Sequence, residues 1–398
     1  MVRKSLITKI FEAFSIQRWN DQIRPVPLVE MDKHGHKMFI TYCLARYEED
    51  AGTRVHWPNL IRGGVYELLR RVVLTDIKSP IYRRIRSQHR DQFIELSRWV
   101  CDQLDPLTDN ETRAEMRAHL VDDRVIDETS RRILEAAHAY ASFWEFQILK
   151  QVHPNGQHVA RIEREMYNDI EPHLALTGMR KMMSRCDVAQ FIDLVGQLRF
   201  QVRWGQTLRV PSTSVLGHSM MVATLMFFFS RDLPDCCERR MRNNFFGGLF
   251  HDLPECLTRD IISPVKGAAK DLPNVIQEIE RELVQKEILP LVETLWRPEL
   301  MYFMEDEFTS KIRTDGAPKP STSDEINASY NSDEFDPVDG QLIKAADHLA
   351  AYVEAYTSSA MGFRTPHVIN GMQGLREAWV GKTLGGIDIG AIYADFGN

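Results

Sequence analysis

The chain has 398 residues, of which 26% are charged, and its formal net charge is -7. This length is sufficient for two domains of ordinary size. The modest negative charge, without a long basic block, excludes duplex nucleic acid as an expected partner. A cluster of arginines at positions 83, 84, 86 and 90 is expected to lie on a solvated helix face.

The N-terminal residues 1–14 mix apolar and charged side chains and lack the apolar core and cleavage site of a signal peptide. The longest apolar run, residues 220–229, is too short to span a bilayer. Six cysteines are present without a CxxC spacing or the density of a disulfide framework. We therefore expect a cytoplasmic protein with reduced thiols and no membrane association.

Most of the chain carries apolar residues at three- and four-residue spacing, which is typical of amphipathic helices, and no convincing series of strands. The fold class is therefore predicted to be all-α. An acidic stretch rich in Ser, Pro and Gly, residues 305–340, is expected to form a long surface loop or a partly disordered insertion. The clearest predicted helices cover 92–104, 130–152, 188–201, 216–230, 275–289 and 341–357.

The second half of the chain repeats features of the first. Residues 63–80 align without a gap to residues 247–264, with seven of eighteen positions identical. Residues 134–138 match residues 343–347, and in each half a glutamate follows seven residues later. These blocks predict a tandem duplication, with a first copy over residues 1–175 and a second copy over residues 176–398.

Two shorter correspondences support the repeat. Arg18 and Trp19 align with Arg203 and Trp204, and Gly35-His36 aligns with Gly217-His218, although His34 is an equally possible partner of His218. The four blocks occur in the same order in both halves.

The second copy contains a set of residues of metal-ligand type. His218 begins an apolar helix, and His251 and Asp252 are adjacent where another apolar helix meets a proline. Asp347 lies within a helix among alanines, where a buried carboxylate needs a partner such as a cation. Two imidazoles and two carboxylates suit one divalent metal ion, and the sequence leaves open whether it is Mn, Co, Ni, Fe, Zn or Mg.

The order of these residues on helices resembles the HD-domain superfamily of metal-dependent phosphohydrolases, an all-helical fold. The Arg203-Trp204 pair, the spacing His-Asp-x-x-Glu and the stretch from Asp260 to Lys266 resemble its bacterial 5′-deoxynucleotidase (YfbR-like) branch, over about residues 185–357. The resemblance implies that His218, His251, Asp252 and Asp347 hold the metal. It also implies that Glu255 and Asp260 act on the attacking water and the leaving group. By the same resemblance, Arg203 holds the substrate phosphate and Trp204 packs on the sugar.

The first copy lacks this set. Glu67 and Leu68 stand in place of His251 and Asp252, Arg71 in place of Glu255 and His138 in place of Asp347, while Asp76 remains. We therefore expect no HD-type metal and no hydrolysis in the first copy. Family members commonly form homodimers, which implies that the two copies pack as an internal pseudo-dimer. Arg18 and Trp19 are retained either for packing or as part of a pocket that senses nucleotide.

The expected function is that of a metal-dependent phosphohydrolase acting on a nucleotide, above all a deoxyribonucleoside 5′-monophosphate. A nucleoside triphosphate or a cyclic nucleotide is an alternative substrate, and a nucleotide-binding regulatory protein is an alternative class. A di-iron oxygenase is disfavoured, because residues 253–346 contain no histidine to supply further ligands. A homo-oligomer beyond the internal pseudo-dimer is a possible assembly.

Overall fold

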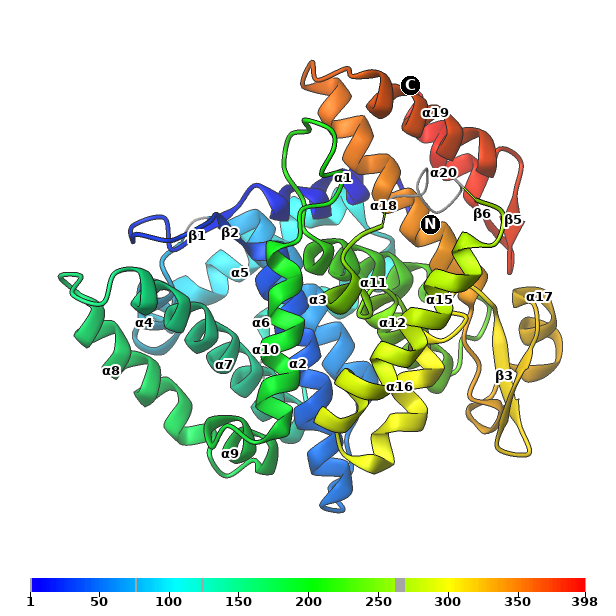
Figure 1. Cartoon of the computed structure of the whole chain (residues 1–398). Helices are drawn as coiled ribbons and strands as arrows, with labels where there is room; N and C mark the ends of the chain where they lie inside the picture. Colours follow the sequence, from blue (N-terminus) through cyan, green and yellow to red (C-terminus); the bar gives the residue numbers. More distant parts are fainter. Residues whose placement is uncertain (1, 76, 123–124, 262–268, 398) are drawn as a thin grey trace.

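A computed structural model describes residues 2–75, 77–122, 125–261 and 269–397. Helices make up most of these residues, which confirms the all-α prediction (Figure 1). The helices of the N-terminal half are α1 (Lys4–Phe11), α2 (Glu30–Asp50), α3 (Trp57–Leu74), α4 (Ser79–Gln88), α5 (Arg90–Leu104), α6 (Asn110–Val121), α7 (Glu128–Val152) and α8 (Val159–Ile170).

The remaining helices follow the chain to its C-terminal end, and the six clearest predicted helices all occur. They are α9 (Thr177–Met183), α10 (Asp187–Gln197), α11 (Val215–Asp232), α12 (Glu238–Phe250), α13 (Glu255–Thr258), α15 (Leu272–Leu283), α16 (Arg297–Met304), α17 (Ser323–Glu325), α18 (Gly340–Ala360), α19 (Pro366–Trp379) and α20 (Ile389–Asp395).

Strands in the described residues form three two-stranded antiparallel ribbons. They pair β1 (Gln17–Arg18) with β2 (Leu28–Val29), β3 (Lys311–Thr314) with β4 (Ala317–Pro320), and β5 (Thr383–Leu384) with β6 (Ile387–Asp388).

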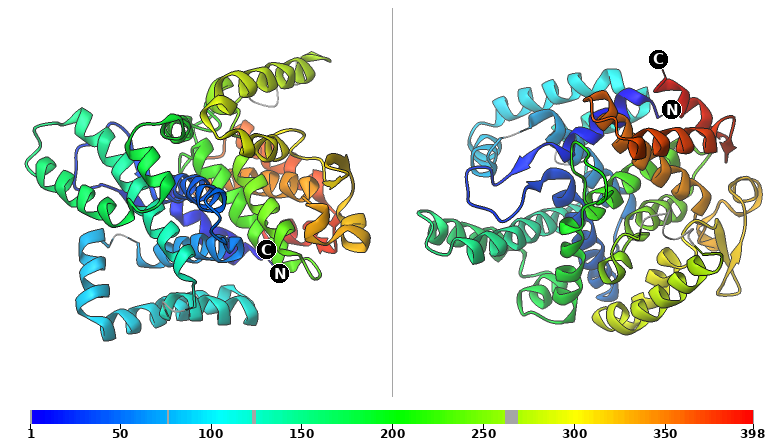
Figure 2. Two further views of the ribbon diagram at one scale, coloured as in Figure 1. Left: turned by 90° about the horizontal axis from the view of Figure 1, so that it is seen from below. Right: turned by 45° about the horizontal axis from the view of Figure 1, so that its top comes forward.

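The segment 305–340 lies at the surface, as expected, but it is folded rather than loop-like. It contains the β3–β4 ribbon and α17, which project beside α16 in Figure 2. Its return to the body of the protein is fixed by Asp336, whose carboxylate accepts a hydrogen bond from Asn243 on α12 and whose carbonyl accepts one from Tyr302. Composition alone missed this, because the polar residues make specific hydrogen bonds to other elements.

Two long helices, α2 and α11, lie side by side at the centre, and nearly all of their residues are buried (Figures 1 and 2). They cross closely because Gly35 and Gly217 have no side chains at the crossing. A Cβ atom added to Gly35 would lie 3.0 Å from the carbonyl oxygen of Leu216, and one added to Gly217 would lie 2.6 Å from a carboxylate oxygen of Asp32. Buried residues of both halves form one continuous hydrophobic cluster. The domain boundary near residue 175 stays a prediction.

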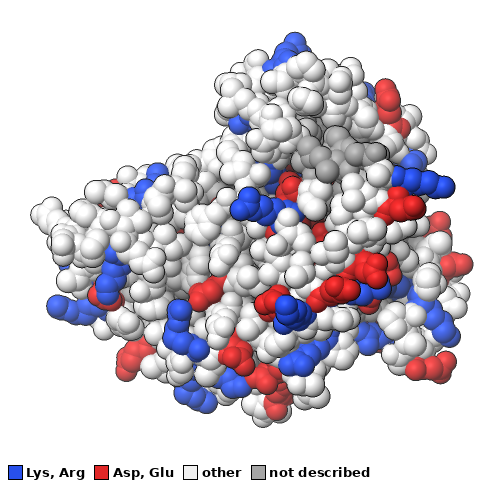
Figure 3. Space-filling view, viewed as in Figure 1, with Lys and Arg blue, Asp and Glu red and all other residues white. Residues whose placement is uncertain are grey.

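The outer helices cover this central pair. α7 packs on α2, α18 packs on α11, and α12 packs against both α11 and α3. None of the helices in the described ranges is long and apolar enough to cross a membrane. The six cysteines, all at described positions, form no disulfide. Basic and acidic side chains are interspersed over the face shown in Figure 3.

Helix α18 carries Asp347, and a buried ion pair anchors the N-terminus of this helix. Arg240 on α12 donates to both carboxylate oxygens of Asp339, at 2.7 and 2.8 Å, and both side chains are fully buried. Asn244 donates a further hydrogen bond to Asp339 and accepts one from its backbone amide. The pair therefore fixes α18 against α12.

We predict that Asp339→Ala lowers the free energy of unfolding by about 3–5 kcal/mol, because it leaves the Arg240 charge buried without its partner. Urea unfolding measures this change. Lys9→Ala removes the exposed pair of Lys9 with Glu12 and serves as the control, with an expected loss below about 1 kcal/mol. Equal stabilities of the two variants would show that the buried pair does not anchor α18.

Candidate metal centre

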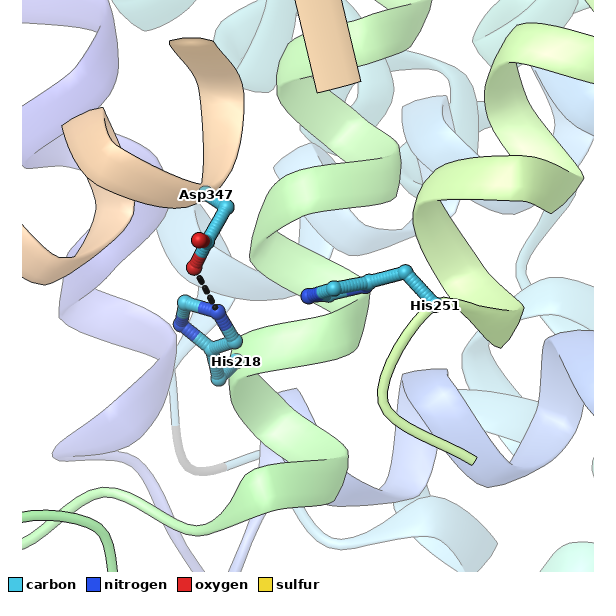
Figure 4. Close-up of side chains that lie close together, drawn as sticks. All are labelled: His218, His251 and Asp347. Atoms are coloured by element: carbon cyan, nitrogen blue, oxygen red, sulfur yellow. Dashed lines mark hydrogen bonds and ion pairs between the residues drawn. The ribbon is translucent and has the colours of Figure 1, made fainter. Parts of the chain in front are cut away.

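Three predicted ligands come together from three different helices. His218 lies in the first turn of α11, His251 directly follows α12, and Asp347 lies within α18. One potential ligand atom from each residue lies within 4.8 Å of the others, and Figure 4 shows the side chains pointing toward a common space. His218 Nε2 is 2.9 Å from Asp347 Oδ1.

Asp252, the fourth predicted ligand, lies beside this group. Its Oδ2 atom is 3.2 Å from His251 Nε2 and 3.8 Å from His218 Nε2. The structure thus places Asp252 next to two of the three clustered residues. The sequence folds this way because α12 ends at Phe250, so that His251 and Asp252 leave the helix together.

Both imidazoles are oriented through their other ring nitrogen. His251 Nδ1 is 2.8 Å from the carbonyl oxygen of Gly248, which makes Nδ1 the donor and leaves Nε2 free to act as a ligand. His218 Nδ1 is 3.6 Å from Glu354 Oε1. Partners of this kind fix the tautomer and orientation of metal-binding histidines.

The two carboxylates and two imidazoles shift each other's protonation. Burial disfavours a charged imidazole, but Asp252 raises the pKa of His251 to about 9. Burial favours a neutral carboxyl, yet the charges of His251, His218 and Arg203 hold the pKa of Asp252 well below its usual value. A metal bound here would displace protons from the imidazoles, since it takes neutral imidazole and ionised carboxylate.

The residues fit a divalent metal on this structure's own geometry. His251 Nε2 is buried and makes no hydrogen bond among the described residues, although it faces the other candidate ligands. Asp252 and Asp347 bring two half-buried carboxylates to the same imidazole of His218, an arrangement that a cation would stabilise. The donor set of two nitrogens and two oxygens suits the metals expected from the sequence.

Arg203 and Trp204, the predicted substrate-binding residues, lie next to the ligands. Arg203 Nη1 is 3.5 Å from Asp252 Oδ2, and its Nε is 3.5 Å from Glu354 Oε1. The indole N–H of Trp204 donates to Glu354 Oε2 at 2.7 Å. A Cβ atom added to Gly371 would lie 2.9 Å from the Trp204 ring, so the indole lies between α18 and α19.

The two predicted catalytic carboxylates are less closely tied to the ligands. Glu255 is buried at the start of α13, and its amide donates to the carbonyl of Asp252, which keeps it one turn from the metal ligands. Burial lowers the pKa of Arg203, while the charges of Glu354, Asp252, Asp347 and, least, Asp260 raise it, so Asp260 lies within electrostatic reach of Arg203. The stretch 263–266, which contributed to the family resemblance, lies outside the described residues.

Sequence reasoning missed three residues of this site. The sequence indicates Glu354 only as part of the repeat and does not predict its contacts with His218, Arg203 and Trp204. Its position about two helical turns after Asp347 is the signal that could have indicated them. Glu307 and Phe308 belong to the segment expected to be a loop. The Phe308 ring lies 6.2 Å from that of His251, and burial together with Asp252 raises the pKa of Glu307.

The N-terminal half repeats part of this arrangement. Trp19, with φ 54°, and Trp204, with φ 59°, both adopt the left-handed conformation that non-glycine residues rarely take. The indole N–H of Trp19 donates to Glu145 at 2.8 Å, as that of Trp204 does to Glu354. Two tryptophans thus have the same unusual backbone and the same kind of hydrogen-bond partner.

Backbone hydrogen bonds also align the starts of α2 and α11. The amide of Glu30 bonds to the carbonyl of Ile16, and the amide of Val215 bonds to the carbonyl of Gln201. Each pair joins the first residue of its helix to a residue fourteen positions earlier, two residues before the Arg-Trp pair. The two helices therefore begin at equivalent points.

This register corrects the sequence alignment of His218. Three residues after the helix start, α2 carries Lys33, not His34 or His36. His36 instead places Nε2 3.0 Å from the carbonyl oxygen of Ile192 and packs against Trp144. The sequence suggested His36 because it follows a glycine, but the two glycines serve the helix crossing. Asp76 lies outside the described residues.

Comparison with protein families gives one match: residues 195–376 match the HD domain family. The matched range includes His218, the His251-Asp252 pair and Asp347. Searches among curated proteins and among solved structures returned no match. Residues 195–376, called the HD domain below, are thus similar to the HD domain family.

Proposed function

We propose that the protein is a metal-dependent phosphohydrolase that removes phosphate from a nucleotide, with a deoxyribonucleoside 5′-monophosphate as the first substrate to test. The observation that carries this proposal is the position of Arg203. Its guanidinium lies 3.5 Å from the metal-ligand carboxylate of Asp252 and is largely buried. A guanidinium beside a metal site suits a phosphate group that the metal and the arginine bind together.

When bound, the divalent metal would neutralise phosphate charge and lower the pKa of a water ligand. The four ligands hold it, and Glu354 keeps His218 and Arg203 in place through one carboxylate. Arg203 donates N–H bonds to the phosphate oxygens. Glu255 and Asp260 are the assigned carboxylates for taking a proton from the attacking water and giving one to the leaving oxygen.

Trp204 is the residue assigned to the sugar. Its indole is held at one edge by Glu354 and lies close to Gly371 on α19, so the ring has a fixed position beside Arg203. A rigid ring next to the phosphate anchor is suited to excluding a 2′-hydroxyl by contact. A triphosphate, a cyclic nucleotide or simple nucleotide binding without hydrolysis would each give a distinct result in the substrate panel below.

We also infer that the chain arose by tandem duplication and that its halves pack as an internal pseudo-dimer. The positive φ angles shared by Trp19 and Trp204, and by Thr75 (φ 52°) and Arg259 (φ 65°), support this inference. The central contact of α2 with α11 supports it as well. Cytoplasmic location remains a proposal from the sequence.

The purified protein is expected to contain a divalent metal and to release phosphate from a deoxyribonucleoside 5′-monophosphate with Mn, Co, Ni or Mg. Asp252→Ala should lose the metal, because a ligand carboxylate is removed, and should release phosphate at the rate of buffer alone. Metal analysis and a phosphate-release panel of mono-, tri- and cyclic nucleotides measure both. Asp315→Ala, in an exposed turn, is the control. Bound metal without release from any nucleotide would contradict the hydrolase assignment.

Glu255→Gln should lower kcat by about 10²–10⁴-fold, the range expected for loss of a general acid–base group. Its metal content should stay at the level of the unmodified protein, since Glu255 is not assigned as a ligand. Steady-state kinetics and metal analysis of the same preparation separate the two effects. Retention of more than a tenth of kcat would remove Glu255 from the reaction.

A packing contact with the sugar is expected to favour deoxyribonucleotides over ribonucleotides by about ten-fold or more in kcat/KM. Trp204→Ala should abolish this preference. The ratio of kcat/KM for the two sugars is the measurement. Trp19→Ala is the matched control, because it removes the equivalent indole of the N-terminal half and should leave the ratio unchanged. If both variants keep the preference, Trp204 does not read the sugar.

A further inference from the structure

The N-terminal half carries a cluster of cations where the HD domain carries its metal ligands. Lys33 occupies the position of His218, and its Nζ is 2.6 Å from His138 Nδ1, just as His218 contacts Asp347. Lys37, one turn further along α2, pairs with Glu67, the residue that aligns with His251. Ammonium groups thus stand in the region that corresponds to the metal site.

The carboxylates around this cluster are already paired with other cations. Glu30 accepts from Arg18 at 2.9 Å and from Arg71 at 2.7 Å. Glu145 accepts from Arg18 at 2.8 Å and from Arg199 at 2.9 Å. Among the described residues, no ion pair includes Lys33, so its charge lacks a direct carboxylate partner.

The protonation of the cluster agrees with this surplus of positive charge. Lys33 is only 1% exposed. Its burial, with the charges of Arg18 and Lys37, holds its pKa well below the ordinary value for lysine. The charge of Lys33 likewise lowers the pKa of His138, so that its imidazole is neutral. An anion next to Lys33 would relieve both effects.

The outer edge of the cluster lies at the protein surface. His138 is exposed although its Nδ1 contacts the buried Lys33, and Arg71 and Glu67 are partly exposed. Trp19 stands beside it with the same backbone conformation and indole hydrogen bond as Trp204 in the HD domain. The N-terminal half therefore keeps the arginine and tryptophan that the HD domain places beside its metal centre, and replaces that centre with lysine.

We propose that the N-terminal half contains a metal-independent binding site for a phosphate group, in which Lys33, with Arg18 beside it, receives the anion and His138 marks the entrance. With the anion bound, the Lys33 ammonium would supply the positive charge that a metal would supply in the HD domain. Leu68, in the position of Asp252, is neither an anion nor a ligand, so phosphate bound here is held and not hydrolysed. That the phosphate belongs to a nucleotide rests on the proposed function.

Binding is tested by titrating the full chain with inorganic phosphate, and separately with deoxyadenosine 5′-monophosphate, by calorimetry in excess EDTA. EDTA removes the metal, and Arg203→Ala in every sample removes the phosphate anchor of the HD domain. The protein should bind one phosphate group per chain under these conditions. Tighter binding of the nucleotide than of inorganic phosphate identifies a nucleotide site, and equal binding identifies a site for phosphate alone.

Two substitutions of His138 separate charge from shape. His138→Asp places a carboxylate against Lys33, as Asp347 stands against His218, and should weaken phosphate binding by about ten-fold or more. His138→Asn is similar in size but uncharged, and it should bind within about three-fold of the parent. Because residue 138 is exposed, both variants should keep the circular dichroism spectrum of the parent.

Lys33→Met provides an independent variant that should abolish binding. Unchanged phosphate binding in both Lys33→Met and His138→Asp would overturn the proposal. Complete loss of phosphate binding on introducing Arg203→Ala alone would also overturn it. Because binding is measured without metal and without turnover, a failure of the hydrolase assignment leaves this result unaffected, and the reverse also holds.

Discussion

The arrangement of the HD domain depends on one buried carboxylate, that of Glu354 on α18. It faces His218 Nδ1, the Arg203 guanidinium and the Trp204 indole, and it also accepts a hydrogen bond from Thr213 at 3.0 Å. Burial alone would favour its neutral form, but Arg203 and Arg209 hold its pKa well below the usual value. One carboxylate thus aligns His218, Arg203 and Trp204, all of which lie far from Glu354 in the sequence.

The N-terminal half repeats this interaction through Glu145, which binds Arg18 and Trp19 and in addition Arg199 from the second half. The supporting carboxylate is therefore common to both halves, while the groups in front of it differ. In the HD domain two carboxylates and two imidazoles leave a place for a cation. In the N-terminal half lysines stand there instead, which reverses the sign of the ligand that would bind.

The clustering of His218, His251 and Asp347 could be predicted because their residue types, their order and their helical context are all visible in the sequence. The helix positions could also be predicted, because apolar residues recur in the sequence at three- and four-residue spacing. The partner of His218 in the first half could not be read correctly, because the register of α2 is set by a backbone bond between Glu30 and Ile16. The fold of residues 305–340 depends on partners such as Asn243 and Tyr302, which composition does not reveal.

The contact between α2 and α11 also fixes the two clusters relative to each other. Ser214 caps α11 by accepting a hydrogen bond from the Gly217 amide, and its hydroxyl donates to Asp32 on α2. Asp32 immediately precedes Lys33, and Gly217 immediately precedes His218. A single hydroxyl thus ties the residue before Lys33 to the residue before His218, so a rotation of α2 against α11 would move the two clusters together.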